Sequence, residues 1–89
     1  MALVNYISPY HKITGTKQEH INAGNLRELC AAIIARHGNE MGFLVDENNE
    51  LSKKTVLLVD GRNAHILDGS DTPVDSGTVI HIMSYLGWA

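Results

Sequence analysis

The side chains of this sequence that could do chemistry directly are one cysteine, five histidines and a short acidic run. A lone cysteine, Cys30, can form neither an internal disulfide nor a zinc site built from paired cysteines. The histidines lack the His-x-x-x-His spacing of many metal sites, so we expect them on the surface or on a sheet face. They are His11, His20, His37, His65 and His81. The sequence therefore predicts neither a catalytic group nor a metal site.

The acidic run resembles a calcium loop only superficially. Asp46, Asn48 and Glu50 alternate as calcium ligands do, but the glycine and the distal glutamate that such a loop needs are not in place. Asp60 and Asp68 each precede a glycine, which is typical of a turn rather than of a catalytic acid. We therefore expect residues 46–50 to form a solvated loop.

The end of the chain is the remaining candidate. An apolar strand is predicted to lead directly into the tail at 84–89, which would hold the tail at a defined place and suit a chain that presents its own end to a partner. In the tail we assign the functional residues Gly87, Trp88 and Ala89. The predicted partner interface lies on the closing strands and the tail, at His65, His81, Met83, Tyr85 and Leu86.

Composition limits the remaining function classes. With 89 residues there is room for one domain, 1–89, that includes the tail. The net charge is −3 and the seven basic residues are dispersed, which argues against a nucleic-acid partner. No apolar run approaches the roughly 18 residues that span a bilayer, and the first residues show no secretory signal. We expect a cytoplasmic protein without a membrane partner.

One helix is predicted over Leu26–His37. Asn25 is a suitable N-cap, Glu28 stands where a capping box needs an acid, and Gly38 can end the helix. Apolar positions recur at helical spacing along one face, which should cover a sheet. That face consists of Leu26, Leu29, Cys30, Ile33, Ile34 and His37. Cys30 is therefore expected to be a core residue.

β-Branched and aromatic residues predict the strands. The predicted strands are Leu3–Ile7, Thr16–Ile21, Val56–Val59, Ala64–Leu67 and Val79–Met83. The second of them is expected at a sheet edge.

Turns and connections separate these strands. Tyr10–Gly15 should be a connection, Met41–Val45 a turn packed under the helix, and Asp60-Gly61 a hairpin turn. Several strands with one helix indicate an α+β class, and a parallel pair formed by the first and last strands would give a β-grasp, or ubiquitin-like, mixed sheet. Ile80 and Ile82 should then face the helix.

The chain resembles the small sulfur-carrier subunits of the MoaD and ThiS family in four segments: Val4–Ile7, Val59–Asn63, Leu67–Val74 and Ser76–Ile82. The likeness extends over essentially the whole chain and is most specific in its C-terminal third.

The resemblance implies a function carried by the tail. An adenylyltransferase of the MoeB/ThiF type activates the terminal carboxylate of such carriers with ATP, and sulfur then replaces the adenylate to give a thiocarboxylate. A sulfur-acceptor enzyme, such as the molybdopterin synthase large subunit, receives the sulfur. The carrier itself holds no cofactor stably, because the partner uses the ATP. The pterin branch is favoured over thiamin thiazole or sulfur-containing amino acids, since the C-terminal third resembles MoaD more than ThiS.

The tail departs from the family pattern. Trp88 and Ala89 stand where the family has Gly-Gly, whose lack of side chains suits a narrow channel. One reading is removal of the last residues after Gly87 by a processing metalloprotease, and another is an activating enzyme with a wider channel. A third is a non-conjugating binding or regulatory module with Trp88 as its anchor. Trp88 could equally fold back over an apolar patch.

Overall fold

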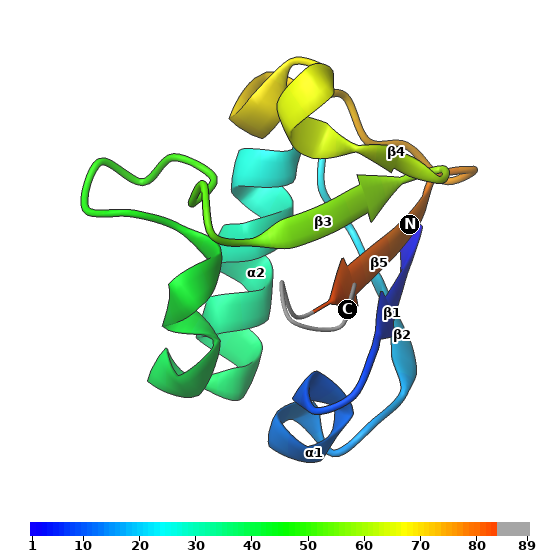
Figure 1. The fold of residues 1–89 in the computed structure, drawn as a ribbon. Coiled ribbons are helices and arrows are strands. Elements are labelled where there is room, and N and C mark those ends of the chain that lie inside the picture. Colours follow the sequence, from blue (N-terminus) through cyan, green and yellow to red (C-terminus); the bar gives the residue numbers. More distant parts are fainter. Residues whose placement is uncertain (84–89) are drawn as a thin grey trace.

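Five strands form one mixed sheet in the order β2-β1-β5-β3-β4 (Figure 1). The structure is a computed structural model that describes residues 1–83. The strand bounds are Ala2–Tyr6 for β1, Gln18–Ile21 for β2, Val56–Val59 for β3, Arg62–Asn63 for β4 and Val79–Met83 for β5. The predicted α+β class and β-grasp fold are confirmed, because one main helix packs across this mixed sheet.

The centre of the sheet is a parallel pair. β1 runs parallel to β5, and the register pairs Val4 with Ile80 and Tyr6 with Ile82. β1 also pairs antiparallel with β2, which lies at the sheet edge as predicted, while β5 pairs antiparallel with β3 on its other side. β5 is therefore flanked by strands on both sides.

The helix α2, Leu26–His37, begins and ends where the sequence predicts. The side chain of Asn25 accepts a hydrogen bond from the N–H of Glu28 at 2.9 Å. The Glu28 carboxylate reaches back one residue beyond the expected partner and accepts the N–H of Gly24 at 2.8 Å. Gly38 ends the helix at a φ of 90°, a conformation that side chains disfavour, and its N–H donates to the carbonyl of Ile34 at 2.8 Å.

The core lies between α2 and one face of the sheet. Ile80 and Ile82 are fully buried in it, as expected, and so is Cys30. Their main partners are Val4, Ile21, Leu26, Leu29, Ile33, Met41, Leu44 and Leu57. The alternate residues of each strand therefore point to the opposite face of the sheet.

The predicted returning strand Ala64–Leu67 is wrong. β4 has only two residues, and a 3-10 helix, Ala64–Ile66, follows it. The Asn63 side chain accepts the N–H of His65 at 2.9 Å, which turns the chain out of the sheet. The preceding turn is as predicted, with Asp60 and Gly61 at φ values of 51° and 87° that suit a tight hairpin.

Two further segments are more helical than predicted. Residues 10–15, expected as a connection, contain a short helix, α1, Tyr10–Thr14. The Tyr10 ring stacks on that of Phe43 with 4.6 Å between centroids, so a contact distant in sequence supports this helix. The turn expected at Met41–Val45 falls in a 3-10 helix, Asn39–Leu44, except for Val45, which is extended.

Candidate functional site

The tail residues assigned from the sequence lie outside the residues that the structure describes. They are Tyr85, Leu86, Gly87, Trp88 and Ala89. The described chain ends with β5, whose last residue, Met83, pairs with Val56 of β3. The structure therefore fixes where the tail departs, at the end of the strand that β1 and β3 flank.

Met83 lies on the face of the sheet opposite α2, which we call the outer face. Its partly or fully exposed residues are Leu3, Asn5, Gln18, His20, Leu58, Asn63, Val79, His81 and Met83. Within the described residues these positions hold apolar side chains, amides and imidazoles but no carboxylate. Such a mixture without carboxylates fits a surface that a protein partner covers, because charged residues are depleted at the core of protein interfaces.

The structure brings two predicted interface residues together on this face. His81 lies between Asn5 of β1 and Leu58 of β3, and Met83 lies one position further along the same side of β5. Sequence reasoning missed Asn5 and Leu58, although the alternation of β1 and the register of β3 place them beside His81. The period-2 pattern of the strands was the available signal.

The third predicted interface residue within the described chain, His65, lies beside the sheet rather than on it. It belongs to the 3-10 helix Ala64–Ile66, and its Nε2 lies 3.2 Å from the carbonyl oxygen of Thr55. Thr55 precedes the β3 residue that pairs with Met83. His65 is therefore at the end of the sheet from which the tail departs.

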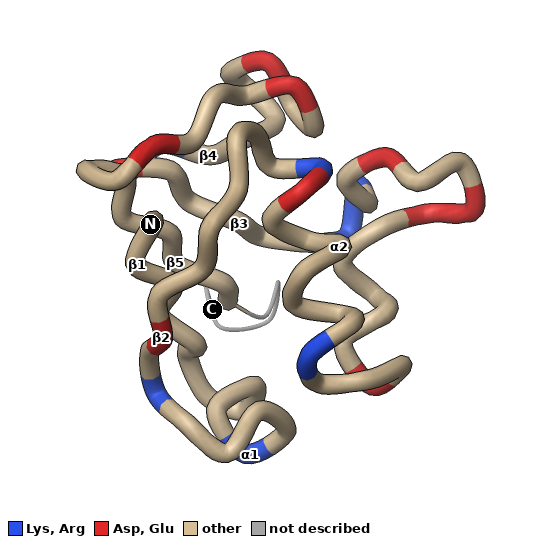
Figure 2. Tube along the Cα trace, turned by 180° about the vertical axis from the view of Figure 1, so that it is seen from behind, with Lys and Arg blue, Asp and Glu red and all other residues tan. Residues whose placement is uncertain are grey.

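Acidic residues lie away from the outer face. Figure 2 shows most of them on the loops and around α2. Arg27 joins two of these loops, because its guanidinium donates to Glu50 at 2.8 Å and to Asp71 at 2.7 Å, and these bonds raise its pKa. Asp46 accepts the N–H groups of Asn48 and Glu50 within its own turn, as expected of a solvated loop. Among residues 1–83 no cluster of three metal-ligating side chains is found.

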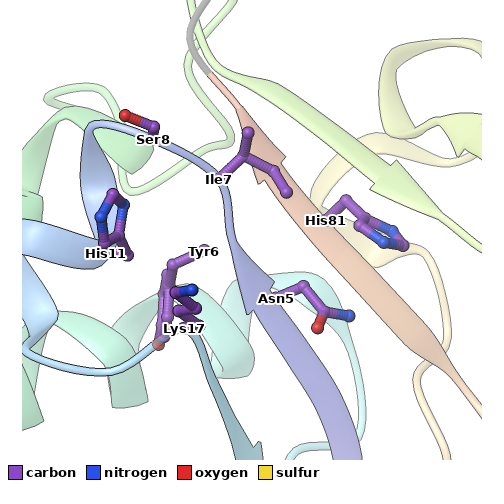
Figure 3. Close-up of a pocket in the computed structure, with 7 residues that line it drawn as sticks. All are labelled: Asn5, Tyr6, Ile7, Ser8, His11, Lys17 and His81. Atoms are coloured by element: carbon purple, nitrogen blue, oxygen red, sulfur yellow. The ribbon is translucent and has the colours of Figure 1, made fainter.

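A cavity of about 400 Å³ opens at the β1–β5 end of the outer face (Figure 3). The two parallel strands contribute Asn5, Tyr6 and His81 to it. The chain after β1 and the approach to β2 supply Ile7, Ser8, His11 and Lys17. The sequence did not predict this cavity, since strands and segments remote in sequence form it.

A separate polar cluster joins β1, β2 and the end of α2. The Tyr6 hydroxyl donates to Glu19 at 2.7 Å, and Arg36 and His37 also contact that carboxylate. The Glu19 and His37 side chains are only 14% and 12% exposed. Burial opposes ionisation of Glu19, but the hydrogen bonds from Tyr6, Arg36 and His37 outweigh it and lower the pKa of Glu19. Burial and the bond to Glu19 raise the pKa of Tyr6. We interpret the cluster as structural.

Replacing Glu19 by glutamine is expected to cost about 1–3 kcal/mol at neutral pH, because Arg36 and His37 lose a partly buried charged partner. The folded-state pKa of Glu19 is lowered, so its contribution is present above the pKa of the unfolded chain and is lost as the pH falls through the folded-state pKa. Urea unfolding of Glu19→Gln and of the exposed Glu47→Gln, from neutral to acidic pH, checks this. A Glu19→Gln deficit independent of pH would contradict it.

Cys30 lies in the core as predicted. Burial raises the pKa of its thiol to about 12, so it is protonated at neutral pH. A protonated, buried thiol is a poor nucleophile, which agrees with a packing role.

Comparison with known proteins supports the fold. No family model matches the sequence, and no curated protein matches it. The structure is similar to a chain of the BexX/CysO complex of Amycolatopsis orientalis, with a TM-score of 0.83 and 19% identity over 94% of each chain. It is similar to CysO of Mycobacterium tuberculosis, with a TM-score of 0.82 and 16% identity over 94% of this chain and 98% of that one.

A third solved structure bears on the resemblance seen in the sequence. A protein of Pyrococcus furiosus, proposed to be subunit 1 of molybdopterin converting factor, has a TM-score of 0.72 and 21% identity over 93% of this chain and 94% of that one. Among residues 1–83 no helix is long and apolar enough to cross a membrane. The chain therefore shares the β-grasp fold of these solved structures.

Proposed function

We propose that this chain is a sulfur carrier whose C-terminal carboxylate is adenylated and then converted to a thiocarboxylate. The observation that carries the proposal is the position of Met83, the last described residue, at the end of β5 on a partly apolar outer face where residues 1–83 place no carboxylate. The β-grasp fold and the structural likeness to a molybdopterin converting factor subunit support it. Because the proposal assigns the chemistry to partners, no catalytic group of this chain is needed.

The proposed reaction has two balanced steps. A carboxylate oxygen attacks the α-phosphorus of ATP on an adenylyltransferase of the MoeB/ThiF type, and pyrophosphate leaves. A hydrosulfide-equivalent sulfur then attacks the acyl-adenylate, AMP leaves, and a thiocarboxylate remains. The thiocarboxylate sulfur bonds to the substrate of an acceptor enzyme, for which the molybdopterin synthase large subunit is the favoured type, and water then cleaves the acyl–sulfur bond and restores the carboxylate. This chain contributes a rigid body and a docking surface.

Because the tail lacks Gly-Gly, there are two ways in which its terminal carboxylate could be adenylated. A metalloprotease could remove Trp88 and Ala89, leaving Gly87 as the terminal residue. Alternatively, the activating enzyme accepts the full tail. A chain ending at Gly87 that is adenylated much faster than the full chain would favour processing, while equal rates would favour a wide channel.

A second function, a non-conjugating binding module, uses the same outer face. It is favoured by Trp88 itself, since tryptophan is enriched among the residues that dominate binding energy. Such a module would bind a partner through the outer face and tail but release no pyrophosphate with any adenylyltransferase. Pyrophosphate release therefore separates the two functions.

Placing a carboxylate at the centre of the outer face is expected to weaken docking of the adenylyltransferase. His81→Glu puts a charge between Asn5 and Leu58, where partner contact would remove it from water, so we expect at least about tenfold weaker binding. Titration calorimetry with the adenylyltransferase measures the affinity.

The matched control adds one negative charge elsewhere. Asn48→Asp lies on the exposed acidic loop and should bind as the unchanged chain does. Equal binding by all three chains would show that docking does not use the outer face.

A further inference from the structure

The cavity at the β1–β5 end of the outer face has nitrogen-bearing side chains on both sides of β1. Figure 3 shows His81 on the β5 side of this strand and His11 and Lys17 on its other side, with Asn5 on the strand itself. Ile7, which is 37% exposed, adds an apolar wall. The volume of about 400 Å³ is in the range of concave binding sites, so the cavity has room for one side chain of another protein.

Within residues 1–83 the cavity has no carboxylate of its own. The residues that line it include neither aspartate nor glutamate. The acidic side chains that pair with a cation or an imidazole in the described chain pair with Arg27, Arg36 or His37, none of which lines the cavity. Lys17 is exposed. No carboxylate of residues 1–83 therefore balances the positive charge of Lys17.

The chain around the cavity is positive, although the protein as a whole has a net charge of −3. Residues 1–18 contain Lys12 and Lys17 but no aspartate or glutamate. Glu19 follows directly, and Arg36 and His37 contact its carboxylate. Figure 2 shows basic segments on α1 and just before β2, while most acidic segments lie elsewhere. The charge around this end of the sheet is therefore complementary to an anion.

The exposure of this site favours a protein occupant over a small free anion. In open water an ion pair with one exposed ammonium contributes little to binding, because solvent screens it. Asn5 and His81 belong to the outer face as well as to the cavity, so a protein that covers this face also covers the cavity. Covering the pair excludes water from around it and strengthens the attraction between its charges.

We infer that the cavity receives an aspartate or glutamate side chain of the protein that docks on the outer face. The carboxylate pairs with the Lys17 ammonium, and the Asn5 amide and the Ser8 hydroxyl are further donors at the site. Ile7 offers apolar contact to the methylene groups of the incoming side chain. The inference rests on the proposed function, because it gives the chemistry of the surface with which the adenylyltransferase docks.

Two variants that each remove one positive charge test this inference. Lys17→Gln removes the ammonium of the cavity but keeps the backbone carbonyl that accepts the N–H of Tyr6. Arg62→Gln removes a charge from β4, at the opposite edge of the sheet. At about 0.1 M salt, titration calorimetry with the adenylyltransferase should give about tenfold weaker binding for Lys17→Gln and unchanged binding for Arg62→Gln.

Two results of this titration would overturn the inference. One is an affinity of Lys17→Gln equal to that of the unchanged chain. The other is an equal loss in both variants, which would indicate long-range attraction to the whole protein rather than a contact in the cavity. Circular dichroism establishes that both variants are folded.

Salt distinguishes an ion pair from lost packing of the lysine methylene groups. At about 1 M salt the Debye length falls to about 3 Å, so the difference between Lys17→Gln and the unchanged chain should at least halve. A difference that salt leaves undiminished would mean that Lys17 contributes through its methylene groups. The assignment of a carboxylate to the cavity would then be wrong.

Inorganic phosphate is the probe for the other occupant, a small free anion. Amide chemical shifts of the chain alone are followed by NMR during a phosphate titration. We expect no saturable shifts around Asn5, His11 and Lys17 below about 1 mM phosphate, because the pair needs a covering protein. Saturation in that range would assign the cavity to a small anion and overturn the protein occupant.

The inference and the proposed function can fail separately. An adenylyltransferase that binds the chain with the expected Lys17 effect, yet releases no pyrophosphate, would overturn the carrier function and leave the docking contact standing. Pyrophosphate release with equal affinities for the unchanged chain and Lys17→Gln would do the reverse. An adenylyltransferase that does not bind the chain at all would overturn both.

Discussion

A chain that ends at Met83 is expected to lose activation by the adenylyltransferase altogether and to keep its fold. The proposed reaction takes place on the terminal carboxylate, and a carboxylate at the end of β5 has no chain left with which to enter another protein's active site. The core residues that the structure describes are all kept in this shortened chain. We expect a melting temperature lower by at most about 8 °C, the shift that loss of about 1 kcal/mol produces in a domain of this size.

Three chains make this experiment decisive. Residues 1–89, 1–87 and 1–83 are compared in pyrophosphate release with the adenylyltransferase and in thermal melting. The chain 1–87 should be active, and the rate of 1–89 relative to it separates trimming from a wide channel. Activity of the shortest chain would place the reactive group elsewhere, and a collapse of its melting temperature would place the tail in the core.

Truncating Ile80 to alanine is expected to cost about 2–5 kcal/mol of unfolding free energy. Ile80 is fully buried on the central strand β5, between Val4 of β1 and Val59 of β3. The neighbouring strands are fixed by backbone hydrogen bonds, so the space left by the side chain can close only partly. Urea unfolding of the full chain measures the loss.

The same truncation at Ile66 provides the control. Ile66 is 76% exposed, so Ile66→Ala should stay within about 0.5 kcal/mol of the unchanged chain. Similar losses at Ile66 and Ile80 would mean that β5 is not the packed centre of the sheet. The register that places His81 and Met83 on the outer face would then be wrong.

The central part of the fold was predictable because local signals and long-range packing agree there. Asn25 caps α2 in sequence and in structure, and the apolar period places Leu29 and Ile33 in the core. Alternation along β5 puts Ile80 and Ile82 on one face, and the expectation that this face meets the helix is confirmed by their burial. Each of these residues satisfies its local propensity and its tertiary contacts at once.

The secondary-structure predictions were wrong where tertiary contacts or side-chain caps determine the backbone conformation. The stretch from Ala64 has the apolar character of a strand, but the Asn63 side chain caps a 3-10 turn there. Helix α1 is too short to show a periodic pattern, and the stacking of Tyr10 on Phe43 supports it from a distant segment.

The candidate site was only partly predictable. The departure point of the tail and the exposure of His81 follow from the strand order and the alternation of β5. The cavity does not, because Ile7, His11 and Lys17 meet only through the β1–β2 hairpin and the turn that carries α1. The cavity can be found only in three dimensions, because the segments that line it share no sequence pattern.

The most direct test of the carrier function is the intact mass of this chain isolated from the cells that make it, with the sulfur acceptor removed so that product accumulates. The account predicts a population whose C-terminal carboxylate has exchanged one oxygen for sulfur, on Ala89 or, after trimming, on Gly87. A chain found only with an unmodified carboxylate, although the adenylyltransferase is present and active, would contradict it.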